Sequence, residues 1–560
     1  MKSRYFSLLK TFKKLPVTSF LLYWVCALGI SPASAKPTLI QDSSEPPKLT
    51  SPFGKNGDVY EFRKALPSLI AAKDSFYDRS VDSATATRLS LEDCIRLSFE
   101  NNPGVQKTIA DLRSSKDNLI ATQREWNPTV TIQGNSLPKS TYRESFAGEN
   151  RSSNKKAPKR KQESSTATIS GEDSAALSAT LNWKYLDFSR QPRINSRSSA
   201  YDAQEYVYIS FSRNLIAQVQ SEYFRLISLI DLVQSYTLIV DAQLENAKAI
   251  DAKFSAGRVS LLDVGQVYSQ LYNSMTSLVS FINQYYETSS RLASLIALPD
   301  SENLITPTDD NKFYGRWKLD LPASIQSASN NNEKIKASLE TAQVNRWEGI
   351  AQLNTALPSF NLGASAGWRS NNMRTSTYRT SCPNQICSPT TQSSLPWNSS
   401  SDISVYMGFT WTLYQGGINN ANASASFNRS KSFEYQALDD KNLLISQVKT
   451  NFNSLDANII SFNSAEAAVY SSRTAYDAAL ARLRAGLTDI TTVNQSIQAY
   501  QDAIRTRASS IRDYNIALAE LYSAAAIWPP NTENLAVGQL SSPQDQELTE
   551  VQDPELTEVK

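Results

Sequence analysis

The sequence contains no histidine, which removes several kinds of chemistry at once. Without an imidazole there is no Ser-His-Asp or Cys-His nucleophile and no histidine-ligated zinc site. A glycine-rich phosphate loop is also lacking, and no motif pairs two acidic residues for acid and base catalysis. The sequence therefore predicts a protein that is not an enzyme and has no cofactor or metal site. A hydrolase with a carboxylate pair assembled by the fold is the alternative.

Cysteine is almost as scarce, with four residues in 560. Cys382 and Cys387 lie five positions apart in a segment rich in Pro, Ser and Thr. In an oxidising compartment this spacing favours a small disulfide. A metal-binding pair is the alternative, although no histidine exists to complete such a site. Cys94 lies on an apolar helical face and is expected in the core.

Net charge is low, and much of the positive charge near the N-terminus belongs to a segment with the composition of a secretory signal peptide. A basic head precedes an apolar run over 15–30, and Ala33-Ser34-Ala35 predicts cleavage after Ala35. An uncleaved membrane anchor is the alternative, but the run is short for a span. The basic residues of the head are Lys2, Arg4, Lys10, Lys13 and Lys14. Their loss changes the formal net charge from +2 to −3, so no binding of nucleic acid is expected.

The chain contains two copies of one pattern, about 229 residues apart. One apolar stripe comprises Leu215, Val219, Tyr223, Leu226 and Ile230, and it recurs as Leu444, Val448, Phe452, Leu455 and Ile459. The spacing within each stripe indicates an α-helix. Ala256-Gly257 and Ala485-Gly486 keep the same offset, and Trp183 with Trp411 and Pro128 with Pro358 nearly keep it. Agreement over this length indicates an internal duplication.

Each copy is expected to run helix, strand, loop, strand, long helix, turn, long helix. The first helices are predicted over 89–124 and 323–353, and each ends before a proline. No proline occurs between Pro192 and Pro299 or between Pro396 and Pro529, and each span predicts a hairpin of two long helices with a turn at Gly257 or Gly486. An arm of ~60 residues extends roughly 90 Å, which predicts an elongated, coiled-coil-like molecule.

Four segments alternate strictly between apolar and polar residues, which predicts strands with one face of each kind. The apolar positions are Val130 and Ile132, then Leu177 to Tyr185, Phe360 to Trp368 and Val405 to Leu413, taking every second residue. The opposite faces are small and uncharged except at Lys184. A soluble sheet over a core is one interpretation. The aromatic ends of the apolar faces favour a membrane barrel with lipid-facing Trp183, Tyr185, Trp368 and Trp411.

Two long polar segments, 136–174 and 369–402, are expected to be loops that join the strands. The first contains a basic run, for which binding of a surface polyanion such as lipopolysaccharide and a solvated mobile loop are the two interpretations. The run comprises Arg151, Lys155, Lys156, Lys159, Arg160 and Lys161.

The expected organisation is a signal peptide over 1–35, a tether over 36–88, a first repeat over 89–300, a linker over 301–320, a second repeat over 321–528 and a disordered acidic tail over 529–560. Four strands are too few to close a membrane barrel, and an open edge is not tolerated in lipid. Several chains must therefore pool their strands.

Short motifs along the chain resemble the TolC-type outer-membrane efflux family. They are Leu89-Ser90-Leu91-Glu92-Asp93-Cys94-Ile95, Asn101-Asn102-Pro103, Trp126-Asn127-Pro128, Asp187-Phe188-Ser189-Arg190 with its counterpart Tyr414-Gln415-Gly416-Gly417, and both Ala-Gly turns. The resemblance covers about 89–528. It implies a mixed α and β membrane protein, a homotrimer whose 12-stranded β-barrel continues into a long helical periplasmic tunnel. It places the chain in the outer membrane of a Gram-negative bacterium.

The resemblance also implies how the protein works. The duct passively conducts small molecules or secreted proteins, and its partners are a periplasmic adaptor (membrane fusion) protein, an inner-membrane pump of ABC, RND or MFS type, and outer-membrane lipid. The hairpin tips contact the adaptor through Ala256, Gly257, Leu261, Ala485, Gly486 and Leu487. A secreted or filament-forming coiled-coil protein without a channel is the alternative, but it does not explain the matched strands.

The same resemblance implies a gate at the tips, formed by Asp263, Gln266, Asp489, Thr492 and Gln495. Asp263 falls at the acidic position of the first tip. The two acidic positions of the second tip are occupied by Thr492 and Gln495, with Asp489 nearby, and this departure argues against a strong cation-binding ring. A helix N-terminal cap is the alternative role of Asp263.

Overall fold

The computed structural model describes residues 61–81, 86–148, 165–298, 304–380 and 391–538. The signal peptide, the basic run and the predicted disulfide of Cys382 and Cys387 lie outside this part of the chain. The chain divides into two units, Met1–Leu69 and Ile70–Lys560. Helix α1 (Glu61–Lys64) lies in the first unit, and α2 (Leu66–Ser80) begins there and ends in the second. Both helices fall in the predicted tether, which the sequence does not identify as helical.

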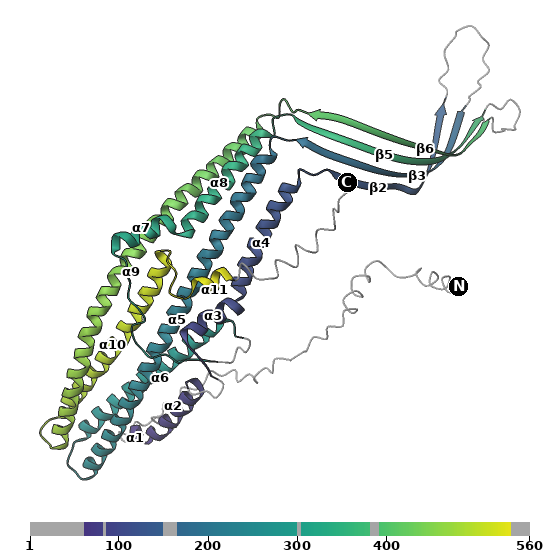
Figure 1. Ribbon diagram of the computed structural model, residues 1–560. Coiled ribbons are helices and arrows are strands. Elements are labelled where there is room, and N and C mark those ends of the chain that lie inside the picture. Colours follow the sequence, from purple (N-terminus) through teal and green to yellow (C-terminus); the bar gives the residue numbers. More distant parts are fainter. Residues whose placement is uncertain (1–60, 82–85, 149–164, 299–303, 381–390, 539–560) are drawn as a thin grey trace, which may run out of the picture. The chain divides into compact units, whose positions relative to one another are not determined.

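The second unit contains two halves with the same order of elements (Figure 1). The first half comprises α3 (Leu91–Asn101), α4 (Pro103–Arg124), β2 (Thr129–Gly148), β3 (Ser165–Leu186), α5 (Arg190–Ser255) and α6 (Leu261–Ile296). The second comprises α7 (Leu321–Asn331), α8 (Glu333–Asn354), β5 (Ser359–Thr380), β6 (Thr391–Thr410), α9 (Ile418–Arg484) and α10 (Ile490–Ala524). At 1.5 Å per residue, the 66 residues of α5 extend about 100 Å.

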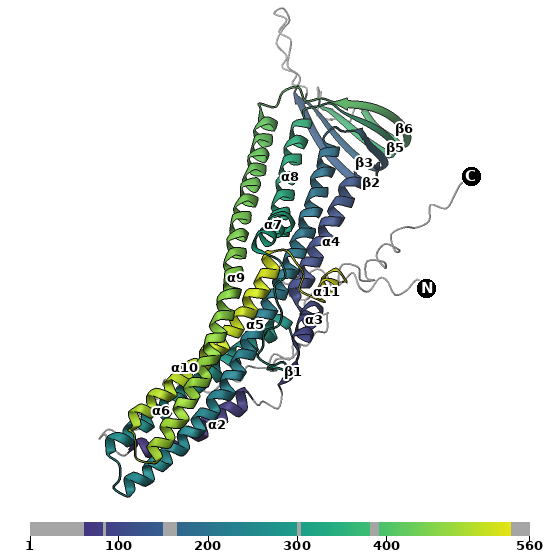
Figure 2. The same ribbon diagram turned by 60° about the vertical axis from the view of Figure 1, so that its left-hand side comes forward.

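The helices form a row in which two long members alternate with pairs of shorter ones (Figure 2). Helices α4 and α6 both lie along α5. Helices α8 and α10 both lie between α5 and α9 and contact each of them. The row therefore has α9 at one edge and the α4 and α6 pair at the other.

Two asparagines join the short helices end to end. Asn102 caps α4 by accepting the N–H of Gly104 at 2.7 Å, and its amide donates to the Leu295 carbonyl at the end of α6, also at 2.7 Å. Asn332 does the same between α8 and α10, with bonds to Lys334 and Ala524 of 3.0 and 3.2 Å. Each joint satisfies an orphan N–H of one helix and an orphan carbonyl of another.

These caps also correct two predictions. Each single helix expected over 89–124 and 323–353 is broken in two, at Asn102 and at Asn332. Both asparagines have an extended backbone, with ψ of 119° and 125°, because a cap residue lies outside the helical region.

The predicted apolar stripe of α5 is core, with Leu215, Val219, Tyr223 and Leu226 no more than 3% exposed. One helix among the described residues, α5, is long and apolar enough to cross a membrane by length and composition. Most of the apolar stretch of α5 is buried against the rest of the chain, so packing in the core accounts for its apolar character. On α9 the stripe is buried at Leu444, Val448 and Leu455 but exposed at Ile459, because α9 lies at an edge of the row.

Further contacts tie the ends of the two repeats together. Strand β1 (Thr87–Leu89) pairs in parallel with β4 (Ile305–Pro307), a contact between distant segments that carries no local sequence signal. The predicted disordered tail is wrong for its first residues, because α11 (Glu533–Gly538) is ordered and Ala536 is 2% exposed. The carbonyl of Ala536 accepts a hydrogen bond from the Tyr208 hydroxyl of α5 at 2.7 Å. The start of the tail is therefore packed against α5, although the acidic composition further along the tail predicts disorder.

The four long strands form one antiparallel sheet in the order β2-β3-β5-β6. Pairing continues far beyond the alternating segments, from Thr129 opposite Asn182 as far as Gly148 opposite Ser165. The prediction of loops over 136–174 and 369–402 is therefore wrong for most of their length. These segments are mostly polar, and their few apolar residues do not form the regular hydropathy alternation that marks a strand, so backbone pairing alone defines them as strands.

Candidate functional site

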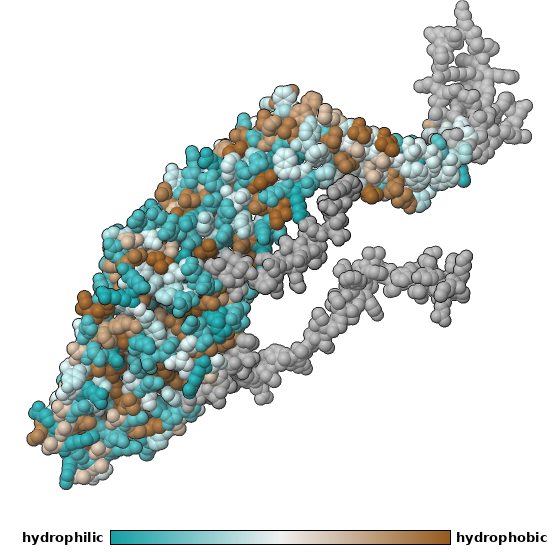
Figure 3. Space-filling model, viewed as in Figure 1, coloured by the Kyte–Doolittle hydropathy of each residue, from teal (hydrophilic) through white to brown (hydrophobic). Residues whose placement is uncertain are grey.

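The register of the sheet places apolar residues beside apolar residues across all four strands. Val130 lies opposite Leu181, Leu181 opposite Ala364, and Ala364 opposite Val405. Many of these side chains are uncovered, and Val130 and Val405 are 68% and 73% exposed. Hydrophobic residues gather on the part of the sheet next to the helices, and paler residues lie toward its far end (Figure 3). An uncovered apolar face of this kind indicates contact with a partner or with lipid.

The predicted lipid-facing aromatics lie on this face or at the end of the sheet next to the helices. Trp183 and Trp411 donate their indole N–H to the carbonyls of Trp126 and Ala356 at 2.8 and 3.1 Å. Each bond ties the end of one strand to the corner where a helix enters the neighbouring strand. The ring of Tyr185 lies 6.2 Å from that of Trp183. Trp368 is 43% exposed, opposite Leu177 further along the sheet.

The opposite face of the sheet is polar. Ser365 and Ser404 share a hydrogen bond of 2.7 Å across β5 and β6. At the next residue pair on the same face, Tyr406 extends across Gly363, and its hydroxyl donates to the Asn182 amide oxygen at 3.4 Å. The sequence alternation places Tyr406 on the polar face, where one aromatic residue among small ones is the signal of a special position, but its contact with Gly363 depends on the strand register.

A buried carboxylate fixes the corner between β3 and α5. Asp187 accepts hydrogen bonds from Lys184 at 2.8 Å and from the N–H and hydroxyl of Ser189 at 3.0 and 2.7 Å. Burial raises the pKa of Asp187, but the Lys184 and Ser189 bonds outweigh burial and lower that pKa to about 2. Arg193 links Asp187 to Glu125 at the end of α4, with N···O distances of 3.3 and 2.8 Å. Arg193 and Glu125 are members of this network that the sequence did not indicate.

The matching corner between β6 and α9 is built from backbone instead. Gly416 and Gly417 have φ of 63° and 79°, a left-handed conformation that glycine adopts without the steric cost of a Cβ. The two copies thus direct a strand into a long helix by different means, side-chain bonds in one and glycine in the other.

The first hairpin tip is a Schellman turn followed by a capped helix. Gly257 has φ of 68°, its N–H donates to Phe254, and the next N–H, of Arg258, donates to Lys253. Ser260 then caps α6, with the Asp263 carboxylate accepting the Ser260 N–H at 2.8 Å and Ser260 accepting the Asp263 N–H at 3.2 Å. The structure thus gives Asp263 the capping role that the sequence left as an alternative.

The second tip repeats this design with different residues. Gly486 has φ of 75°, and Leu487 donates to the Arg482 carbonyl at 2.9 Å. Asp489 caps α10 by accepting the Thr492 N–H at 3.0 Å, and bonds from Thr492 hold the pKa of Asp489 below its ordinary value. The predicted adaptor-contact residues Ala256, Gly257, Ala485, Gly486 and Leu487 are exposed, and Leu261 is partly exposed.

The first halves of α6 and α10 also contact each other, and uncharged polar groups join them. Asn494 donates to the Gln266 carbonyl at 3.3 Å, Gln498 to the Gln270 side chain at 3.2 Å, and Gln501 to Ser274 at 2.8 Å. Of the predicted gate residues, Gln266 therefore takes part in the contact between the hairpins. Gln495 is exposed. Asp263 and Asp489 are each engaged within their own turn.

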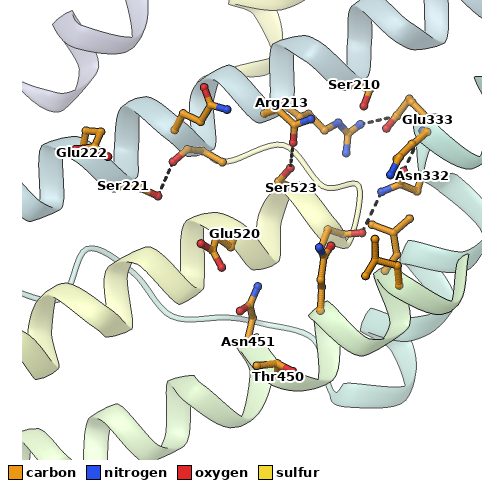
Figure 4. A pocket seen from close by; sticks show the side chains of 18 of the residues that line it. Ser210, Arg213, Ser221, Glu222, Asn332, Glu333, Thr450, Asn451, Glu520 and Ser523 are labelled. Carbon is orange, nitrogen blue, oxygen red and sulfur yellow. Dashed lines mark hydrogen bonds and ion pairs between the residues drawn. The ribbon is translucent and has the colours of Figure 1, made fainter. Parts of the chain in front are cut away.

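A hollow of about 960 Å³ lies where α5, α6, α8, α9 and α10 meet, and its lining includes several charged residues (Figure 4). Arg213, 8% exposed, forms an ion pair of 2.9 Å with Glu333 and lies 4.5 Å from the ring centroid of Trp528. Other charged residues that line the hollow are Glu222, Arg225, Arg291, Lys334 and Glu520. The mixed signs do not select an ion of one charge. Among the described residues, no group of three His, Cys, Asp or Glu side chains is placed to bind a metal.

Comparison with known proteins gives a consistent result. The family described as Outer membrane efflux protein matches residues 94–298 and 324–526, which together exceed half of the chain. The chain is similar to Outer membrane protein TolC of Escherichia coli (strain K12), with 23% identity over 378 residues, 65% of this chain and 72% of that protein. Outer membrane protein TolC of Salmonella enteritidis is 21% identical over 462 residues, 81% of this chain and 84% of that protein.

Among solved structures, the CmeC outer membrane channel of Campylobacter jejuni is similar in fold. The TM-score is 0.60 at 14% identity, covering 84% of this chain and 91% of that chain. The family match spans both hairpins and the strands between the helices. The chain belongs to the outer membrane efflux protein family, and the predicted function, an exit duct in the outer membrane with a periplasmic extension, is confirmed.

Proposed function

We propose that three copies of this chain form one continuous duct, a twelve-stranded barrel in the outer membrane followed by a tunnel of helices in the periplasm. The observation that carries the proposal is the four-stranded sheet, whose outer strands β2 and β6 each pair on one side only within the described residues. An uncovered apolar face is stable in lipid, but unpaired strand edges are tolerated there only if the sheet closes with other copies.

Exposed apolar side chains on α9 support the same assembly below the membrane. Tyr435, Leu438, Ile460 and Tyr470 are between 56% and 79% exposed along a helix at the edge of the row. In a closed ring this edge meets the α4 and α6 edge of the next copy. Burying such residues stabilises association by about 25 cal/mol for each Å² of apolar surface removed from water.

Conduction in this assembly is passive. The polar sheet face lines the barrel, the helices line the tunnel, and no bond is made or broken in the cargo, which comprises small molecules, secreted proteins or both. The duct acts with a periplasmic adaptor and an inner-membrane pump of ABC, RND or MFS type, which supplies the energy.

The hairpin tips form the entrance. We assign the adaptor contact to the exposed turns around Gly257 and Gly486, and the constriction to Asp263, Gln266, Asp489, Thr492 and Gln495. Asp263 and Asp489 each cap a helix within their own turn, and Thr492 and Gln495 occupy the two acidic positions of the family's second tip, so we expect no strong cation-binding ring at the entrance. We retain the signal peptide over 1–35, the tether, both repeats and the linker as the organisation of the chain, and the Cys382–Cys387 disulfide as part of the outer polar segment.

The test is to record single-channel current from the purified, detergent-extracted protein in a planar lipid bilayer and to measure its mass alongside. Steady conductance from a species of three chains is expected. A monomer or filament that never conducts would instead support the structural coiled-coil alternative.

A further inference from the structure

The polar face of the sheet carries one side chain whose position depends on a glycine. Tyr406 on β6 lies directly opposite Gly363 on β5, which lies opposite Asn182 on β3. The Tyr406 ring extends over Gly363, and its hydroxyl reaches the Asn182 amide oxygen at 3.4 Å. The ring therefore lies along the sheet across three strands.

Gly363 makes this position possible because it has no side chain. A Cβ added at Gly363 would lie 2.6 Å from the Tyr406 hydroxyl oxygen and 2.7 Å from Cε1, closer than non-bonded carbon atoms approach. The added Cβ would meet ring carbons as well as the hydroxyl oxygen, so the whole Tyr406 ring would have to move. In agreement, Gly363 is buried although it lies on the polar face, while Gly408, two residues after Tyr406, is exposed with nothing within 4 Å of an added Cβ.

A strand side chain without such a glycine stands roughly perpendicular to the sheet. On the polar face of a closed barrel, perpendicular means into the lumen. Ser365 and Ser404 form the next residue pair on this face of the same strands. Their side chains are small and hydrogen-bonded to each other, so they also project little from the sheet.

We propose that Gly363 sets the width of the barrel lumen by keeping the Tyr406 ring flat against the wall. The inference rests on the proposed function, since it requires the polar face to line a conducting pore. In an assembly of three chains, three tyrosines lie at one level, so raising all of them narrows the pore there and favours smaller cargo.

The experiment compares single-channel conductance of wild type, Gly363→Ala, Tyr406→Ala, the double variant and Gly408→Ala in planar bilayers, each confirmed as three chains by mass. With Gly363→Ala the ring is displaced into the lumen, and conductance is expected to fall below that of wild type, because a narrower section adds resistance to the pore. Uncharged polyethylene glycols of graded size should be excluded at a smaller size than in wild type. Gly408→Ala, the matched glycine on the same face, should leave both readouts unchanged.

The double variant separates this mechanism from a general effect of alanine. Without the tyrosine ring there is nothing to displace, so Gly363→Ala/Tyr406→Ala should conduct as well as Tyr406→Ala alone. The effect of Gly363→Ala on conductance then depends on Tyr406, whereas two independent substitutions would have additive effects. Unchanged conductance in assembled Gly363→Ala, or no recovery in the double variant, would overturn the inference. Absence of conductance in the wild type would instead overturn the proposed function.

Discussion

At the scale of single residues, the Asp187 carboxylate carries a defined share of stability. Its pKa falls from 3.8 to about 2 on folding, which corresponds to about 2 kcal/mol per chain. Because the folded pKa is the lower one, this contribution is present above about pH 4 and is lost as the pH falls toward 2. Asp187→Asn should therefore lower the free energy of unfolding by about 2 kcal/mol at pH 7 and by much less at pH 2.

Urea-induced unfolding in detergent at both pH values measures this difference. Asp111→Asn, which changes an exposed aspartate on α4, is the matched control and should have little effect at either pH. An Asp187→Asn penalty that is the same at pH 7 and pH 2 would show that its charge is not what stabilises the corner.

At the scale of elements, the two hairpin turns depend on glycine for backbone reasons alone. An added Cβ at Gly486 meets nothing within 4 Å, yet its φ of 75° is costly for a β-branched residue. Gly486→Val should distort the tip and impair export while trimers remain intact, whereas Gly486→Asn should export normally, since asparagine tolerates this conformation. Dye accumulation in cells with each variant as their sole channel of this family, together with trimer amounts on unheated gels, measures both effects. Normal export by Gly486→Val would argue against the tip as a gate.

Elements whose pattern is local were predictable from the sequence. The alternating residues around Leu181 and Val405 do share one face, and Gly257 and Gly486 do mark the turns. The outer halves of the strands were not predictable, since Ser, Thr and Asn on both faces give no periodicity and the partner strand lies far away in sequence. The break at Asn332 was missed for a related reason: its amide bonds to Ala524, 192 residues away.

Sites within the elements were harder to predict than the elements. The gate role of Asp263 rests on resemblance and stays a prediction, whereas the bond of its carboxylate to Ser260, three residues earlier, is an arrangement that the capping pattern alone suggests. Tyr406 was visible as an aromatic residue on a polar face, yet its contact with Gly363 depends on the register of two strands whose paired residues lie 43 positions apart.

At the scale of the whole molecule, the two faces of the sheet must meet different surroundings, and neighbouring residues of β6 report on them. Val405 lies on the apolar face and is 73% exposed, and Ser404 lies beside it on the polar face and is also exposed. If lipid covers the apolar face, a lysine near its middle costs about 2–4 kcal/mol per chain, while a lysine in the aqueous lumen costs little.

Val405→Lys should therefore sharply reduce the amount of assembled trimer recovered from the outer membrane, as seen on unheated gels. Ser404→Lys adds the same side chain one residue away and should assemble at wild-type levels, with altered ion selectivity because three positive charges then line the pore. Equal recovery of both variants would mean that the apolar face is not in lipid. Loss of Ser404→Lys alone would mean that the faces are reversed, because only an apolar environment penalises the buried ammonium group.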